Sequence, residues 1–178
     1  ENVIGTSGDD TITGNGRPNR FEGGLGDDTL KGDRGDDVYV FARGAGQYLG
    51  DDVIEEFGNS DHDTLDYSGT VDAKLSINLS ATGSQNVLYE GVTVKGKLDL
   101  RSIGAGGGTT IEGVIGTNDN DTIVGNYRPN RFEGRGGNDT MYGHDGVDTL
   151  GGGDDTYVFA RIENENLGQD VIREGLLA

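Results

Sequence analysis

Large apolar residues recur every nine positions along two parts of the chain, each between polar or β-favouring neighbours. They are Ile12, Phe21, Leu30 and Tyr39 in the first part, and Ile123, Phe132, Met141 and Leu150 in the second. The alternation in Thr29-Leu30-Lys31 predicts a very short strand whose central side chain points to a core. A constant interval of this kind predicts a stack of short strands separated by turns, with a thin apolar core.

Between the strands lies a glycine-rich turn of constant design. In residues 23–31, glycine occupies positions one, two and four, aspartate position six, and an apolar residue position eight. Glycines allow positive φ angles and a close backbone approach with carbonyl oxygens turned inward, and Asp28 adds a carboxylate beside them. Oxygen donors of this kind suit calcium at about 2.3 to 2.6 Å and suit zinc or copper poorly. The turn is therefore interpreted as a cradle for calcium.

The same register runs through eight units. The sixth positions are Asp10, Asn19, Asp28 and Asp37 in the first run, and Asp121, Asn130, Asp139 and Asp148 in the second. Asp63, and a shortened unit with Asp155, echo the pattern. The unit resembles the nonapeptide GGxGxDxUx, in which U is a large apolar residue, of the repeats-in-toxin (RTX) or hemolysin-type calcium-binding family. The resemblance implies a right-handed parallel β-roll in which two nonapeptides form one coil and calcium lies between turns stacked on the same side.

The resemblance also implies the metal ligands. Residues two units apart share an edge of the roll, which pairs Asp10 with Asp28, Asn19 with Asp37, Asp121 with Asp139, and Asn130 with Asp148. The candidate ligands for several Ca²⁺ ions are Gly5, Gly8, Asp10, Gly23, Gly24, Gly26, Asp28, Gly32, Gly35, Asp37, Asp63, Asp121, Gly134, Gly137, Asp139, Gly143, Gly146, Asp148, Gly153 and Asp155.

Two turns depart from this design. Arg17-Pro18-Asn19 and Arg128-Pro129-Asn130 carry arginine in place of the fourth glycine and asparagine in place of the sixth aspartate. One interpretation is that these turns bind calcium weakly or not at all, with a guanidinium partly replacing the cation. The other is that asparagine still ligates through its amide oxygen and that the arginines point to solvent.

A duplication organises the chain. Residues 3–23 return as 114–134, at an offset of 111, whereas residues 35–43 return as 153–161, at an offset of 118. The difference of seven indicates that one nonapeptide was gained and two residues were lost, so we expect a distorted turn between Asp148 and Asp155. Because the pattern starts and stops part-way through a period, the chain is interpreted as a segment of a longer secreted protein.

The predicted fold class is all-β, with two β-roll runs and an irregular β segment between them. The predicted boundaries are 1–57 for the first run, 58–111 for the middle segment and 112–178 for the second run. In the middle segment, alternation such as Leu98-Asp99-Leu100 predicts strands. The simplest architecture lets these strands extend the same stack, although a small separate sandwich would give the same pattern.

The composition indicates that folding depends on the metal. Only 31% of the 178 residues are apolar, 34 are glycine, and the formal net charge is −18. Too little apolar surface is available to offset the ordering entropy and the carboxylate repulsion, so disorder is expected without calcium. There is no cysteine for disulfides or thiolate sites. No apolar run reaches the roughly 20 residues of a membrane span, and so acidic a surface argues against nucleic acid as a partner.

Nothing in the sequence indicates catalysis. The two histidines, His62 and His144, have no nucleophile at a suitable spacing. Tyr39 and Tyr157 end their runs, where each hydroxyl is expected to reach water. Five further tyrosines are candidates for an exposed surface, and there is no tryptophan: Tyr48, Tyr67, Tyr89, Tyr127 and Tyr142.

The resemblance implies a calcium-binding segment of a secreted bacterial protein, exported by type I machinery and folded outside the cell, where calcium is plentiful. One alternative is a repeat module of a large adhesin that binds polysaccharide or a cell surface. Another is the non-catalytic C-terminal tail of a secreted protease, lipase or epimerase.

Overall fold

The described part of the chain is built of strands alone. The computed structural model describes residues 1–57, 61–81, 83–103, 110–144, 147–151, 156–158 and 171–173, and no helix occurs among them. The strands are β1 (Asn2–Ile4), β2 (Thr11–Thr13), β3 (Arg20–Glu22), β4 (Thr29–Asp33), β5 (Val38–Val40), β6 (Asp51–Phe57), β7 (Asp63–Asp66), β8 (Lys74–Asn78), β9 (Gly83–Glu90), β10 (Thr93–Ile103), β11 (Ile111–Ile115), β12 (Thr122–Val124), β13 (Arg131–Glu133), β14 (Thr140–Tyr142), β15 (Thr149–Gly151), β16 (Thr156–Val158) and β17 (Val171–Arg173).

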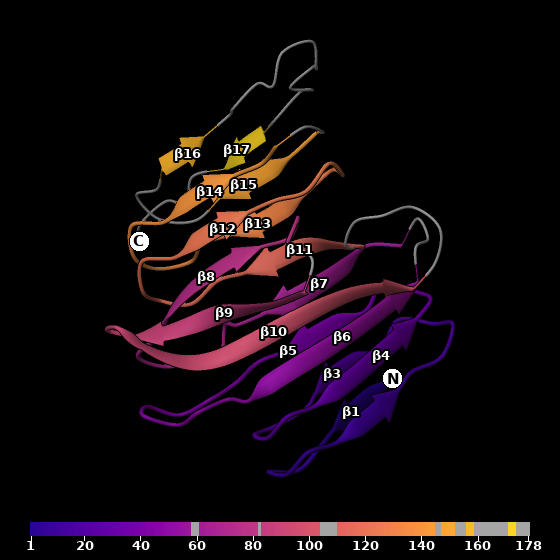
Figure 1. Ribbon diagram of the computed structural model, residues 1–178. Coiled ribbons are helices and arrows are strands. Elements are labelled where there is room, and N and C mark those ends of the chain that lie inside the picture. Colours follow the sequence, from indigo (N-terminus) through magenta and orange to yellow (C-terminus); the bar gives the residue numbers. More distant parts are fainter. Residues whose placement is uncertain are drawn as a thin grey trace.

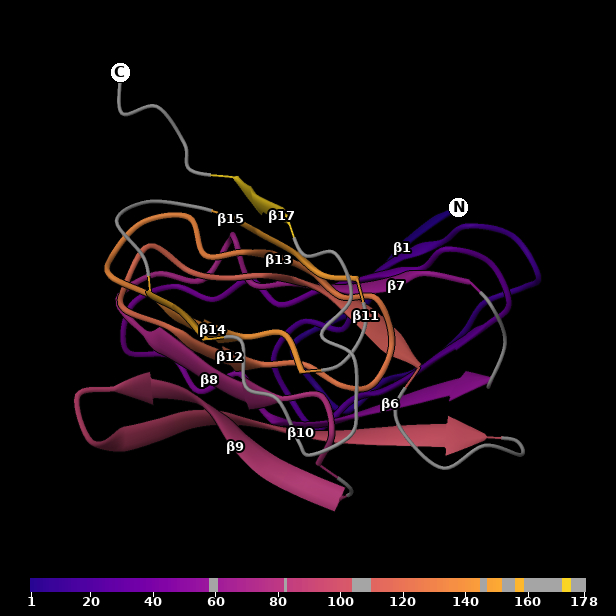
Figure 2. The ribbon, with the colours of Figure 1, turned by 90° about the horizontal axis from the view of Figure 1, so that it is seen from above.

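Successive strands of the two runs alternate between two sheets that face each other across the core (Figures 1 and 2). The eight-stranded sheet has the order β1-β3-β5-β7-β11-β13-β15-β17. The nine-stranded sheet has the order β16-β14-β12-β8-β9-β10-β6-β4-β2. Within each run, neighbours in a sheet are parallel, and most of them are two nonapeptides apart, as in the pairing of Phe21 with Tyr39. The expectation of an all-β parallel roll is confirmed.

The register stacks the eighth-position side chains into the core. Phe21, Leu30, Ile123 and Met141 are at most 2% exposed, whereas Ile12 of the outermost coil is only partly buried. Each buried side chain of this size contributes about 1.5 to 3 kcal/mol. The rings of Phe21 and Tyr39 stack with their centroids 5.4 Å apart.

The expectation for two tyrosines was wrong. Tyr39 and Tyr67 are both fully buried. The hydroxyl of Tyr39 donates a hydrogen bond to the carboxylate of Glu56 instead of reaching water. Tyr67 stacks on Phe41, with the ring centroids 4.6 Å apart, because a later part of the chain covers the end of the first run. Tyr67 is therefore not one of the surface tyrosines, although it was among the five expected there.

The middle segment contributes strands to both sheets. In the eight-stranded sheet, β7 lies between β5 and β11, and Leu65 pairs with Tyr39 on one side and Val114 on the other. In the nine-stranded sheet, β8 is parallel to β12, and the hairpin of β9 and β10 is inserted between β8 and β6. Strand β10 is parallel to β6 over seven residue pairs, whereas β9 is antiparallel to both β8 and β10.

The added nonapeptide moves the end of the second run into the other sheet. Strand β5, with Tyr39, belongs to the eight-stranded sheet, but its duplicate β16, with Tyr157, pairs with β14 in the nine-stranded sheet. One nonapeptide is half a coil, so its insertion shifts the strands that follow it by half a turn of the roll.

Candidate metal centres

The sixth-position residues form two columns, because each lies at or next to the start of a strand. The first column precedes or begins strands of the eight-stranded sheet and contains Asn19, Asp37, Asp63, Glu112, Asn130 and Asp148. The second column does the same in the nine-stranded sheet and contains Asp10, Asp28, Asp52, Asp121 and Asp139.

Hydrogen bonds of one kind join several neighbouring members of each column. One carboxylate oxygen, Oδ1, accepts from the main-chain N–H of the residue one coil earlier. The structure brings all four predicted pairs together at 2.7 to 2.8 Å: Asp10 N to Asp28, Asn19 N to Asp37, Asp121 N to Asp139, and Asn130 N to Asp148. The N–H of Asp37 reaches Asp63 in the same way at 2.9 Å.

The second carboxylate oxygen is the part of the turn that needs a ligand. Oδ2 is buried and has no hydrogen-bond partner in Asp28, Asp37 and Asp63. A buried charged oxygen without a partner carries the full cost of its lost hydration. A hard cation with oxygen ligands removes this cost, so these residues fit calcium.

The position of the carboxylate oxygen Oδ2 explains why the first residue of each unit is glycine. A Cβ added to Gly23 would lie 2.2 Å from Oδ2 of Asp28. The corresponding distances from the glycine of each unit to its own carboxylate are 2.8 Å at Gly5, 2.3 Å at Gly32, 2.1 Å at Gly134 and 2.1 Å at Gly143. The carboxylate therefore folds back onto bare backbone, which only glycine provides.

The fourth-position glycines stack on the turn of the previous coil. A Cβ on Gly26 would lie 2.7 Å from the carbonyl carbon of Gly8. A Cβ on Gly35 would lie 2.5 Å from the carbonyl carbon of Arg17, and a Cβ on Gly137 would lie 2.7 Å from that of Asp119. Gly24, at position two, approaches the carbonyl oxygen of Thr6 and has a φ of 111°. Main-chain carbonyls and carboxylates from two consecutive turns are thus held together.

Two kinds of turn alternate in this stacking. In the turn at 23–28, Gly24 and Gly26 have positive φ and the carboxylate has a free oxygen; we name this an open turn. In the turn at 5–10, Thr6 closes the turn itself, because its N–H and Oγ1 donate to Oδ2 of Asp10 at 2.6 and 2.9 Å; we name this a self-capped turn. Thr117 caps Asp121 at the start of the second run, where its N–H donates to Oδ2 at 2.6 Å and its Oγ1 donates to Oδ1 at 2.8 Å.

The comparison with protein families identifies these turns. The family described as RTX calcium-binding nonapeptide repeat (4 copies) matches residues 4–39, 13–47 and 115–150. Both runs are RTX calcium-binding repeats. The matched ranges contain the open turns of the first run and the self-capped turn of each run, and they leave the middle segment outside. A comparison with curated proteins found no significant match.

The two RTX turns that contain proline are closed by asparagine. Asn130 accepts from the N–H of Asn126 at 2.9 Å and donates to its side-chain oxygen at 3.1 Å. Asn19 donates to Oδ1 of Asp37 at 3.0 Å, in the open turn of the next coil. The guanidinium of Arg128 contacts the buried carboxylate of Glu112 at 3.1 Å, whereas Arg17 is exposed. A guanidinium thus meets a column carboxylate at one of the two turns.

Sequence reasoning missed Asp52 and Glu112. Oδ1 of Asp52 accepts from the N–H of Asp28 at 3.0 Å, and Oε2 of Glu112 accepts from the N–H of Asp63 at 3.1 Å. The segment Gly50-Asp51-Asp52-Val53-Ile54 matches positions four to eight of an RTX unit. Its spacing of 24 residues from Asp28, in place of 18, hid the match.

Burial among other acids raises the pKa of the column carboxylates. Desolvation by burial is the largest cause throughout, and neighbouring carboxylates add to it at most of these sites. The pKa is raised to about 8 for Asp52, about 8 for Asp63, about 7 for Glu112 and about 6 for Asp121. Burial also raises the pKa of Asp28 and of Asp37. The columns therefore resist holding their charge in the absence of a cation.

Three predicted ligands, Gly146, Gly153 and Asp155, lie outside the described residues, as does most of the turn expected to be distorted between Asp148 and Asp155. The described residues contain no helix that could serve as a membrane span.

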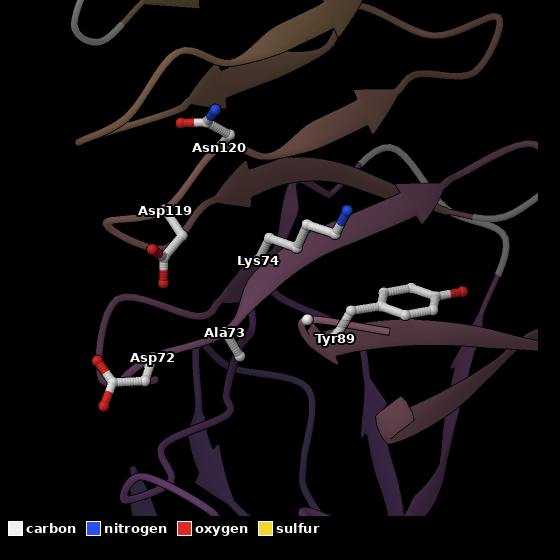
Figure 3. Close-up of a pocket in the computed structure, with 7 residues that line it drawn as sticks. Asp72, Ala73, Lys74, Tyr89, Asp119 and Asn120 are labelled. Carbon is white, nitrogen blue, oxygen red and sulfur yellow. The ribbon is translucent and has the colours of Figure 1, made fainter. Parts of the chain in front are cut away.

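A separate hollow of about 450 Å³ lies where the start of β8 meets the β9–β10 hairpin and the turn before β12. Figure 3 shows Asp72 and Asp119 on one side of it, with Lys74 and Tyr89 on the other. The ammonium group of Lys74 lies 5.9 Å from the centre of the Tyr89 ring, a cation–π distance.

Proposed function

We propose that the chain is a calcium-binding RTX segment of a secreted bacterial protein that is disordered without calcium and folds into the β-roll after export. The observation that carries the proposal is the row of open turns, in which buried carboxylate oxygens have no hydrogen-bond partner. With a net charge of −18, such a chain is destabilised by repulsion among its carboxylates, and bound cations remove that repulsion.

Extracellular calcium modules commonly have dissociation constants of about 10⁻⁴ to 10⁻³ M. Sites of that class stay empty at cytosolic calcium levels, so the chain would remain extended for a type I export channel and fold outside. Linkage gives the size of the effect: calcium at 100 times the dissociation constant stabilises by about 2.7 kcal/mol per independent site. Several sites in one stack compound this gain.

Circular dichroism with calcium, with magnesium and with a chelator tests the switch, and calorimetry gives the stoichiometry. We expect a β-rich spectrum with calcium only, because magnesium needs near-octahedral geometry and gives up its water reluctantly. A β-rich spectrum that persists in chelator at neutral pH would exclude the folding switch. Failure to bind calcium at all would exclude the calcium-binding function.

We also propose that the segment is non-catalytic. The main-chain N–H of His62 donates to the exposed turn residue Asp36. The ring of His144 packs on that of Tyr127, with the ring centroids 5.8 Å apart. The ring of His144 is used for packing, and the spacing of both histidines in the sequence offers no nucleophile for general-base catalysis.

A second candidate function is supported by the hollow beside Tyr89. An aromatic ring, a lysine and several carboxamide or carboxylate groups are the side chains that bind polysaccharide or another cell-surface ligand, as in a module of a large adhesin. Retention on a glycan array that is lost in Tyr89→Ala, but kept in Val92→Ala at the exposed hairpin tip, would support it. Equal retention of both variants would exclude this site.

A further inference from the structure

Three buried carboxylates meet at the junction between the first run and the middle segment. They are Asp37, Glu56 and Asp63, and one oxygen of each lies within 4.8 Å of the others. Their exposed fractions are 0, 2 and 0%. Asp37 and Asp63 come from the first column, whereas Glu56 comes from β6 of the opposite sheet.

Glu56 has no counterpart in the RTX pattern. Its strand slips by one residue against β4, where Lys31 pairs with Glu55 and Asp33 pairs with Glu56. Gly32 is skipped in this register, and the side chain of Glu56 fills the space over its α-carbon. A Cβ on Gly32 would lie 2.1 Å from Oε1 of Glu56 and 2.3 Å from both Oδ2 of Asp37 and the hydroxyl of Tyr39. Oxygens of three residues from two segments of the chain thus converge on one point.

A second observation shows that the group is incomplete. Oδ2 of Asp37, Oε2 of Glu56 and Oδ2 of Asp63 are all buried without a hydrogen-bond partner. Tyr39 donates to Oε1 of Glu56 and fixes that side chain. Among the described residues, none of the three acids forms a salt bridge, and the nearby guanidinium of Arg128 contacts Glu112 instead. Glu112 itself adds a further negative charge beside Asp63.

Three negative charges at this separation repel one another strongly in a dry interior. The surrounding donors are all hard oxygens, and their combined charge matches a divalent cation better than a monovalent one. Calcium accepts irregular sets of carboxylates, whereas magnesium demands near-ideal octahedral geometry and usually keeps several waters.

We propose that Asp37, Glu56 and Asp63 together hold a calcium ion inside the roll, with Glu56 of the opposite sheet as a ligand that the nonapeptide pattern does not contain. This inference rests on the proposed calcium-binding function and assigns the free Oδ2 atoms of Asp37 and Asp63 to this ion. The ion joins β5, β6 and β7, so it fastens the middle segment to the first run.

The test compares Glu56→Gln with Glu55→Gln in the full chain. Glu55 is the neighbouring acid, but it pairs with Lys31 at 2.5 Å and lies outside the cluster. We expect Glu56→Gln to bind one calcium ion fewer than the unaltered chain in equilibrium dialysis, and Glu55→Gln to bind the same number. Equal numbers in both variants would overturn the inference, and no calcium binding by the unaltered chain would instead overturn the proposed function.

Terbium luminescence gives a second test that does not need Glu56→Gln to fold. Terbium replaces calcium and emits when a nearby tyrosine transfers energy to it, and Tyr39 touches the cluster. We expect Tyr39→Phe to lose a larger share of the tyrosine-excited emission than Tyr89→Phe, at equal terbium bound. Equal emission from the two variants would overturn the proposed site.

Discussion

Asp28 uses its two carboxylate oxygens for different tasks. Oδ1 accepts a hydrogen bond of 2.8 Å from the N–H of Asp10, whereas Oδ2 is buried against Gly23 without a partner. The first contact sets the register between coils, and the second oxygen remains for a cation. The two oxygens of Asp37 and of Asp63 are used in the same way, which makes the following effects measurable.

Asp28→Asn keeps an oxygen that can accept from Asp10 but removes the charge beside the cation. We expect a loss of about 2 to 3 kcal/mol in the calcium-loaded free energy of unfolding, the contribution of one site at 100 times its dissociation constant. Asp9→Asn is the matched control, because Asp9 is exposed and accepts from the N–H of Asp27 at 2.9 Å. Urea unfolding in calcium measures both, and equal losses would contradict the role given to Oδ2.

Gly23→Ala should destabilise the calcium-loaded roll by at least about 1 to 3 kcal/mol, the usual cost of overpacking. The new methyl group would meet Oδ2 of Asp28 at 2.2 Å and push the carboxylate away from the turn. Gly8→Ala is the control, because its Cβ has no neighbour nearer than 3.9 Å. Its effect should stay within about 0.5 kcal/mol in the same urea titration.

The hydroxyls of the self-capped turns can be removed without changing shape. Thr117→Val deletes the bond from Oγ1 to Asp121 at 2.8 Å between two buried side chains, and Thr6→Val deletes its exposed equivalent. We expect a loss of about 1 to 3 kcal/mol for Thr117→Val, because a buried carboxylate oxygen loses one of its two donors and keeps only the N–H of Leu75, and a smaller loss for Thr6→Val. Thermal unfolding in calcium ranks the two variants, and the reverse order would show that burial does not set the cost.

Acid should partly replace calcium. Burial raises the pKa of Asp52 and Asp63 to about 8 and that of Glu56 to about 7, each above its unfolded value near 4. A raised carboxyl pKa contributes stability that is complete below the unfolded pKa and is lost as the pH rises through the folded one. In chelator, the β-sheet signal in circular dichroism should therefore be larger at pH 5 than at pH 8. A larger signal at pH 8 would contradict the burial of these groups.

With calcium present, the dependence on pH should reverse, because protons compete with the cation for the same oxygens. Calorimetric titrations at pH 5 and pH 7.5 should show weaker binding at the lower pH. Unchanged affinity would indicate that the carboxylates are not the ligands.

The sequence predicted the repeated part of the fold well, because one local rule generates it. The nine-residue interval placed Phe21 and Leu30 in the core, and the resemblance to the RTX roll put Asp10 beside Asp28. A short-range pattern suffices for both predictions. The inserted hairpin is different: alternation around Leu98 predicted a strand, but nothing local states that it pairs with β6. Glu56 reaches Tyr39 from the opposite sheet, so neither its position nor the burial of Tyr39 follows from the spacing of the turns.

The exchange of sheets between β5 and β16 has a consequence for any chain assembled from such units. An odd number of added nonapeptides inverts whatever follows, whereas an even number only lengthens the molecule. A segment inserted after the last strand of the first copy would therefore leave the roll on the side of one sheet. The same segment inserted after the second copy would leave it on the side of the other sheet. Gaining or losing a single unit is enough to change which side of the particle a downstream ligand-binding loop presents, without altering that loop at all.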